Sequence, residues 1–159
     1  MSEEKFTLEE AQKKFAIKAN GHTWNLLGNE DRTPEDDRML LLAAQASLYH
    51  WLQVGTVVND FRGLYMIAKA YIALGKKKNA LKFAKKTLKL TEANTDKAAD
   101  FDIAFAYELM ARAYAMNGKQ EKFEKFHQKA ADAIEKVADE QDKKICVDDF
   151  AAGPWFGMK

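Results

Sequence analysis

Apolar side chains recur along most of the chain with the three- to four-residue spacing of helices, and no stretch alternates apolar and polar residues as a strand does. In one segment Ala80, Leu81, Ala84, Thr87 and Leu88 share a face whose opposite side carries lysines. The pattern predicts an all-α protein of about seven helices. We expect these helices at residues 8–27, 34–54, 57–74, 77–92, 101–117, 120–138 and 140–151.

Residues that begin and end helices stand at the predicted boundaries. Thr7 and Glu10 have the spacing of a capping box, in which each side chain accepts from the other residue's backbone N–H. Thr33, followed by Pro34, and Thr56 are expected N-caps of the second and third helices. Four helices are followed by a glycine, at Gly28, Gly55, Gly75 and Gly118.

The middle of the chain contains an internal repeat with an offset of 43 residues. Residues 62–88 align with 105–131, and eight of the 27 pairs are identical. The identical pairs are Ala68/Ala111, Ala70/Ala113, Tyr71/Tyr114, Gly75/Gly118, Lys76/Lys119, Lys82/Lys125, Phe83/Phe126 and Lys86/Lys129. A repeated helix, glycine turn and helix is typical of a helical solenoid.

These residues resemble the tetratricopeptide repeat, whose first helix carries a large residue, a small residue and a tyrosine before the turn glycine. The order is followed by Leu64, Ala68, Tyr71, Gly75, Ala80, Phe83 and Thr87, and again by Tyr107, Ala111, Tyr114, Gly118, Phe126 and Ala130. Small Ala68 and Ala111 would let paired helices approach closely, while Tyr71 and Tyr114 would fill the gap to the next hairpin. The chain departs from the pattern at Phe123, where a small residue is expected, and in its longer period.

The resemblance implies one right-handed helical-hairpin solenoid over residues 1–159. We expect an irregular first hairpin at 8–54, repeat hairpins at 57–92 and 101–138, a capping helix at 140–151 and a tail at 152–159, whose Trp155 and Phe156 pack on the last hairpin or on a second protomer. Residues 46–51 and 101–108 also look like a group of small bacterial tetratricopeptide-like proteins. That likeness implies no activity.

Composition and charge exclude several classes of protein. The net charge is +1, so no overall field attracts nucleic acid or an anionic membrane. No apolar stretch is long enough to span a membrane, and the N-terminus lacks the apolar core of a signal peptide. The single cysteine, Cys146, fits a reducing compartment, so we expect a cytoplasmic protein. The lysine-rich fourth helix lacks arginine and free aromatics, which indicates a solvated surface.

The sequence predicts no catalytic site, metal or cofactor. His22, His50 and His127 lie on different predicted helices, without metal-ligand spacing, and Cys146 is expected to be a buried, unreactive thiol. Asp100, Asp102 and Glu108 stand near the start of the fifth helix, where carboxylates complement the helix dipole. No phosphate-binding loop or nucleophile elbow is present.

Arginine is scarce in this chain, which has four arginines among 25 basic residues. An arginine within a repeat helix indicates a fixed, bidentate contact rather than general solubility. In tetratricopeptide repeats the first helix of each hairpin lines the concave face. The resemblance therefore implies a groove lined by Arg62, Tyr65, Lys69 and Ile72 in one repeat and by Phe105, Glu108, Arg112 and Met116 in the next. Alternatively, Glu108 and Arg112 simply pair with each other at i,i+4.

Three functions remain open from sequence alone. The first is a non-catalytic scaffold whose groove binds a protein or peptide, with Arg62, Lys69 and Arg112 meeting acidic groups. The second is a small-molecule-binding protein or an unrecognised enzyme, with a pocket near His50 and Trp51. The third is a structural module that forms homo-oligomers.

Since no set of histidine, cysteine and carboxylate residues has ligand spacing, we expect that excess EDTA leaves the melting temperature unchanged. Thermal unfolding followed by circular dichroism checks this. A fall of several degrees in the chelator would show a structural metal that the sequence does not reveal.

Overall fold

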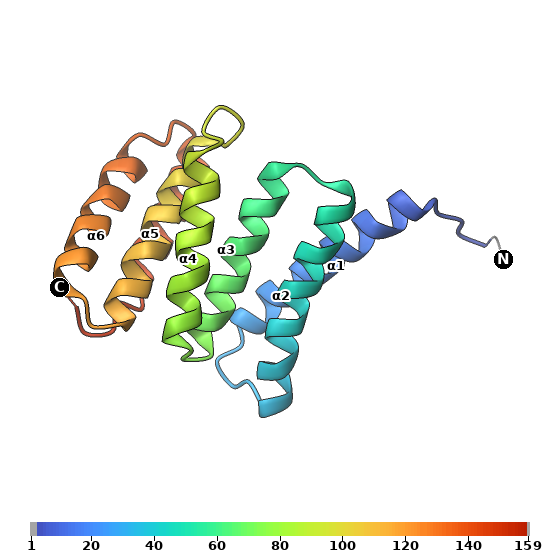
Figure 1. Cartoon of the computed structure of the whole chain (residues 1–159), viewed down its shortest axis with the longest axis horizontal. Coiled ribbons are helices and arrows are strands. Elements are labelled where there is room, and N and C mark those ends of the chain that lie inside the picture. The colour runs from blue at the N-terminus through green and yellow to red at the C-terminus, as the bar shows by residue number, and fades with distance from the viewer. Residues whose placement is uncertain (1–2, 159) are drawn as a thin grey trace.

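A computed structural model describes residues 3–158, and every regular element in this range is an α-helix (Figure 1). The seven helices are α1 (Leu8–Leu27), α2 (Pro34–Val54), α3 (Val57–Ala73), α4 (Lys77–Glu92), α5 (Asp100–Met116), α6 (Gln120–Glu135) and α7 (Glu140–Ala152). The all-α prediction is therefore confirmed. Helices α1, α2 and α4 begin and end at the predicted residues, α3 and α7 differ by one residue at their C-terminal ends, and α5 is shifted by one residue at both ends.

The largest error in the expected boundaries is at the end of α6, which stops at Glu135 rather than 138. The Val137 N–H donates to the carbonyl of Ile134, and the chain turns here. The turn buries the Val137 side chain, which is 3% exposed. The next N–H, of Ala138, donates to Asp100 Oδ2 at 3.0 Å. A carboxylate from the start of α5 thus contacts the chain just after α6.

The helix starts follow the chemistry expected from the sequence. Thr7 and Glu10 form the capping box of α1, with bonds of 3.1 Å from the Glu10 N–H to Thr7 Oγ1 and 2.8 Å from the Thr7 N–H to Glu10 Oε2. Thr33 and Asp36 form a second capping box at α2, with Pro34 in the first turn. These bonds satisfy backbone N–H groups that have no partner inside the helix.

The two aligned glycines end α3 and α5 by the same turn. Gly75 has φ 71° and Gly118 has φ 69°, a region that residues with a side chain rarely adopt. After each glycine the next lysine N–H bonds back to a tyrosine carbonyl, Lys76 to Tyr71 at 2.9 Å and Lys119 to Tyr114 at 3.0 Å. This is the hydrogen-bond pattern of a Schellman helix end, and its recurrence shows that the sequence repeat is also structural.

The helices form three antiparallel hairpins, α1–α2, α3–α4 and α5–α6, arranged side by side along the molecule (Figure 1). Each hairpin packs on the next through the contacts of α2 with α3 and of α4 with α5. Further contacts link α1 to α3, α3 to α5 and α5 to α7, so the odd-numbered helices form a second row. We call this row the inner layer.

Small residues at helix crossings let the hairpins approach closely. Ala68 and Ala111, the aligned alanines, are both fully buried, as the sequence predicts. The aligned tyrosines act differently from the expectation, because each ring pairs with a phenylalanine of its own hairpin. Tyr71 lies 5.4 Å from Phe83, and Tyr114 lies 5.7 Å from Phe126, between ring centres. Both tyrosines also pack on apolar clusters shared with the preceding hairpin.

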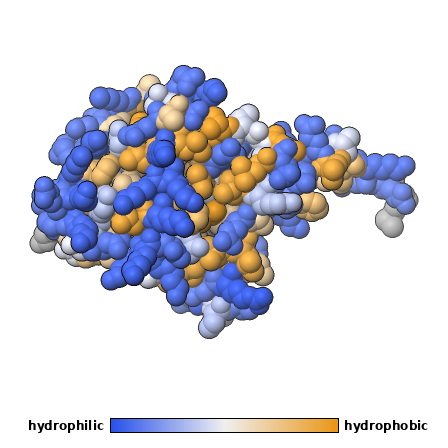
Figure 2. Space-filling model, in the orientation of Figure 1, coloured by the Kyte–Doolittle hydropathy of each residue, from blue (hydrophilic) through white to orange (hydrophobic). Residues whose placement is uncertain are grey.

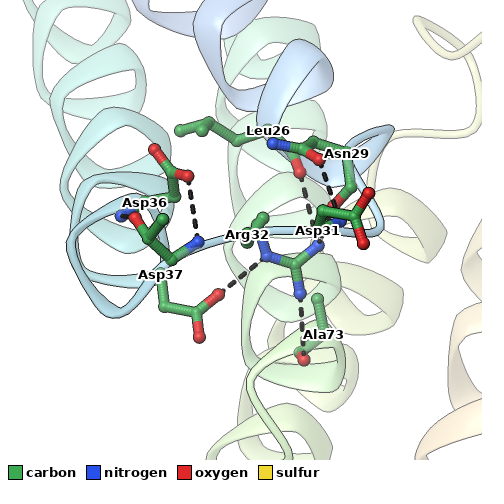
Figure 3. A network of polar contacts seen from close by, with 8 residues as sticks. Leu26, Asn29, Asp31, Arg32, Asp36, Asp37 and Ala73 are labelled. Atoms are coloured by element: carbon green, nitrogen blue, oxygen red, sulfur yellow. Dashed lines mark hydrogen bonds and ion pairs between the residues drawn. The ribbon is translucent and has the colours of Figure 1, made fainter.

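Arg32 fixes the turn between α1 and α2 (Figure 3). Its Nε donates to Asp37 Oδ1 at 2.7 Å, and Nη1 donates to the carbonyls of Leu26 and Asn29 at 3.3 and 3.1 Å. Nη2 reaches the Ala73 carbonyl, at the end of α3, at 3.4 Å. A cation at the carboxyl ends of two helices stabilises their dipoles, and it ties the first hairpin to the second.

The polarity of the surface varies along the molecule. On the face seen in Figure 2, apolar side chains gather mainly over the N-terminal hairpin, whereas polar ones cover most of the rest. Exposed apolar residues of that hairpin include Phe15, Leu42 and Tyr49. The lysines of the fourth helix and the turn before it are all exposed, at Lys76, Lys77, Lys78, Lys82, Lys85, Lys86 and Lys89. Within residues 3–158 no helix has the length and apolarity needed to cross a membrane.

The tail packs on the last hairpin through one of its two aromatic residues. The Trp155 ring lies 5.7 Å from Phe123, 4.9 Å from His127 and 5.4 Å from Phe150, between ring centres, and its Nε1 donates to the Phe150 carbonyl at 3.0 Å. Phe156, in contrast, is 43% exposed.

We therefore expect Trp155→Ala to lower the free energy of unfolding by about 2–3 kcal/mol, somewhat less than the loss typical of a fully buried aromatic residue. Phe156→Ala is the matched control and should change it by less than about 0.5 kcal/mol, as is usual for surface positions. Urea denaturation of both variants measures the difference. Equal losses would show that the tail does not pack through Trp155.

Candidate binding surface

The inner layer brings the predicted groove residues of α3 and α5 together. Arg62, Tyr65 and Lys69 follow one another at i, i+3 and i+7 on α3, and Phe105, Glu108 and Arg112 have the same spacing on α5. The rings of Tyr65 and Phe105 meet edge to face, with their centres 5.7 Å apart. The two helices therefore present these side chains on adjoining surfaces.

A pocket of about 200 Å³ opens on this surface, between the first, second and third hairpins. Helix α1 supplies one wall, which the sequence did not predict. The lining combines aromatic and polar residues with one methionine and comprises Asn20, Trp24, Phe61, Arg62, Tyr65, Met66, Thr87, Thr91, Phe101, Asp102 and Phe105.

Arg62 and Asp102 form a bidentate ion pair in the pocket wall. Arg62 Nε donates to Asp102 Oδ1 and Nη2 donates to Oδ2, both at 2.9 Å. The Asp102 side chain is 6% exposed and also accepts from the Ala99 N–H, whereas the Arg62 side chain is 46% exposed and lies over the Phe101 ring. Asp102 thus complements the helix dipole at the start of α5, as expected, and it also orients Arg62.

Arg112 is committed to groups of its own chain. It is 5% exposed, and it donates to the Glu108 carboxylate and to the backbone carbonyls of Asp149 and Gly153. Trp155 of the tail lies over its guanidinium group, 5.1 Å from the ring centre. The i,i+4 pair of Glu108 and Arg112 is therefore present, and it joins α5 to α7 and the tail.

Lys69, which aligns with Arg112, has no such partners. Its side chain is half-buried, and its Nζ lies 5.8 Å from the ring centre of Trp24 and 5.7 Å from that of Tyr65. Within the described part of the chain no carboxylate lies within ion-pair distance of this amine. Burial and the nearby Arg112 charge lower the pKa of Lys69, and the carboxylates of Asp149 and Glu108 only partly oppose this.

The neighbouring groups show the same effect of burial. Burial raises the pKa of Glu108, although the Arg112 charge opposes the shift, and burial together with the Glu108 charge raises the pKa of Tyr65 well above its ordinary value. Displaced pKa values of this kind are frequent at functional sites, but buried ion-pair networks produce them too. Of these groups, Lys69 is the charged one that forms no ion pair within the described part of the chain.

His50 and Trp51 do not share a pocket. His50 is hydrogen-bonded to Gln12, contacts the rings of Phe15 and Tyr49, and lines a shallow groove on the outer side of α1 and α2. Trp51 lines a separate depression beside the start of α1. Neighbouring residues of a helix point about 100° apart, so this separation follows from the helix itself.

Of the remaining candidates for chemistry, His22 is exposed, whereas Cys146 and His127 are packed into the structure. Cys146 is 1% exposed, and burial raises the pKa of its thiol to about 11. His127 lies among Phe123, Phe150 and Trp155, and burial lowers its pKa. Among residues 3–158 no three histidine, cysteine, aspartate or glutamate side chains are grouped so that they could hold a metal ion.

No protein-family model, curated protein or solved structure matches this chain.

The two inner arginines should differ in their effect on stability. Arg112→Ala leaves Glu108 buried without its cation, and loss of one partner of a buried ion pair typically costs about 3–5 kcal/mol. Arg62 is half-exposed, so in Arg62→Ala water reaches Asp102 and the loss should be about 1–2 kcal/mol. Urea denaturation compares the variants. A larger loss for Arg62→Ala would contradict this assignment of structural roles.

Proposed function

We propose that the protein is a non-catalytic, tetratricopeptide-repeat-like scaffold whose inner layer binds an extended peptide segment that carries acidic groups. Right-handed stacking of the hairpins, as in that repeat, is part of the proposal. The likeness to the tetratricopeptide repeat is supported by the repeated Schellman ends at Gly75 and Gly118, the repeated pairs of tyrosine and phenylalanine, and the row of odd-numbered helices. The single cysteine is consistent with a cytoplasmic protein.

The observation that carries the proposal is the environment of Lys69. The half-buried Lys69 amine lies close to two aromatic rings and has lost part of its hydration, but among residues 3–158 it forms no ion pair with a carboxylate. A ligand carboxylate would provide that partner. Since the environment is partly desolvated, the resulting hydrogen bond would be stronger than one made by an exposed lysine.

Exposed apolar groups on α1 extend the surface beyond Lys69. Ile17 and Trp24, seven residues apart and thus on one face of the helix, are 54% and 45% exposed. A peptide that crosses the inner layer would bury these side chains against its own apolar residues. Peptide-binding surfaces commonly combine a few charged anchors with such an apolar floor.

The alternative, a small-molecule site near His50 and Trp51, has less support. The two residues lie in different depressions, and neither depression contains an arginine. The two buried carboxylates of the inner layer, Asp102 and Glu108, are paired with Arg62 and Arg112, which argues against their use as catalytic acids or bases.

A peptide display library provides ligands for the test. Selected peptides should be enriched in Asp or Glu, and Lys69→Met should weaken their binding about ten- to a hundredfold, which corresponds to the loss of a charge-assisted hydrogen bond of about 1.5–3 kcal/mol. Methionine keeps the length of the side chain and its contact with the rings. Isothermal titration calorimetry measures the affinities.

The matched control is Lys82→Met, which removes an equal charge from the exposed face of α4 and should change affinity less than twofold. If Lys82→Met loses the peptides and Lys69→Met keeps them, the outer face of α4 is the working surface and the proposal is wrong. Circular dichroism verifies that both variants remain helical.

A further inference from the structure

The pocket of the inner layer has few hydrogen-bonding groups left for a ligand. Thr87 and Thr91 line it, but Thr87 Oγ1 donates to the Phe83 carbonyl at 2.8 Å and Thr91 Oγ1 donates to the Thr87 carbonyl at 2.7 Å. Both hydroxyl hydrogens are therefore used within α4. These residues present mainly their methyl groups to the pocket.

The ion pair in the wall is also largely satisfied. Both Asp102 oxygens accept hydrogen bonds, and Arg62 uses Nε and Nη2 to donate them. Within residues 3–158, Arg62 Nη1 and the Asn20 side-chain amide donate no hydrogen bond, and both residues line the pocket. The pocket therefore offers an apolar interior with unused donors on Arg62 and Asn20.

The size of the pocket limits what it can hold. About 200 Å³ is below the ~300–1,000 Å³ typical of pockets for cofactors and drug-sized ligands. It suits a single ring system. The walls provide ring faces and edges from Trp24, Phe61, Tyr65 and Phe105, which favour another aromatic group over an aliphatic one of equal area.

We propose that this pocket binds one aromatic side chain of the peptide ligand, a phenylalanine, tyrosine or tryptophan, and that Arg62 Nη1 and Asn20 donate to a single acceptor beside the ring. The inference rests on the proposed peptide-binding function and names the residue that anchors the peptide.

The position of Lys69 relates this anchor to the acidic groups. Two walls of the pocket, Trp24 and Tyr65, are the same rings that flank the Lys69 amine. A peptide with its ring in the pocket can therefore place on Lys69 a carboxylate from an Asp or Glu within about two positions of the aromatic residue, given ~3.3 Å of extended chain per residue. The expected motif is an aromatic residue beside Asp or Glu.

Indole and phenol are suitable probes of the pocket alone, because they test it without any peptide. In protein labelled with ¹³C at the methionine methyl groups, the Met66 signal should shift saturably with millimolar indole or phenol, since Met66 lines the pocket. Met39, on the outer groove of the first hairpin, is the internal control and should not move. Cyclohexanol, which has no aromatic ring, should bind several-fold more weakly than phenol.

Asn20→Phe, a change at a half-buried position, should fill the pocket and abolish the Met66 shift. Tyr49→Phe, an exposed ring outside the pocket, should keep it. If Met66 does not respond to indole in the wild-type protein, or if Met39 responds equally, the proposal is overturned whether or not the variants fold.

The peptide experiment separates this inference from the proposed function. Replacing the aromatic residue of a selected peptide by alanine should weaken binding about ten- to a hundredfold, the effect expected for exposing a large buried side chain. If acidic peptides bind through Lys69 without any aromatic preference, the pocket assignment fails and the scaffold function stands. If indole shifts Met66 while no peptide binds, the pocket recognises a ring and the scaffold function fails.

Discussion

A pair of antiparallel helices can bury the surface between them but leaves an apolar face on each side, so every hairpin of this protein depends on a neighbour. The aligned alanines Ala68 and Ala111 are fully buried in a core cluster that joins the second and third hairpins. After the third hairpin, α7 and Trp155 cover α5 and α6. The inner surface exists because this stacking places α1, α3, α5 and α7 in one row.

The two arginines of the inner layer differ in burial. Arg112 is buried and paired within the chain, whereas Arg62 remains accessible to solvent. Arg112 has its donors satisfied by Glu108 and by two backbone carbonyls from α7 and the tail. A buried ion pair of this kind adds little net stability compared with apolar residues of the same shape, but it tolerates no loss of one partner. Arg62, by comparison, keeps part of its guanidinium group in contact with solvent while Asp102 fixes its orientation.

The sequence was sufficient to predict the helices because their signals are local. The capping box at Thr7 and Glu10 and the glycine ends at Gly75 and Gly118 involve residues within one or two turns of each other. It also indicated that arginines within the repeat make fixed contacts, since they are rare in a lysine-rich chain. Their partners could not be predicted, because Asp102 lies 40 positions from Arg62 and Gly153 lies 41 from Arg112. The pocket was missed for the same reason, since its walls come from four helices. The early end of α6 was missed as well, because the chain just after it contacts Asp100, which is distant in sequence.

The alignment of Lys69 with Arg112 has a consequence for how such a protein can diverge. If the two hairpins arose by duplication, the same position has acquired two different constraints. A change at Arg112 disturbs the packing of α7 and the tail on α5, because three groups of the chain accept hydrogen bonds from its guanidinium group. A change at Lys69 breaks no ion pair among residues 3–158. In the proposed scaffold, ligand preference can therefore evolve at one copy of the position while the other copy preserves the fold.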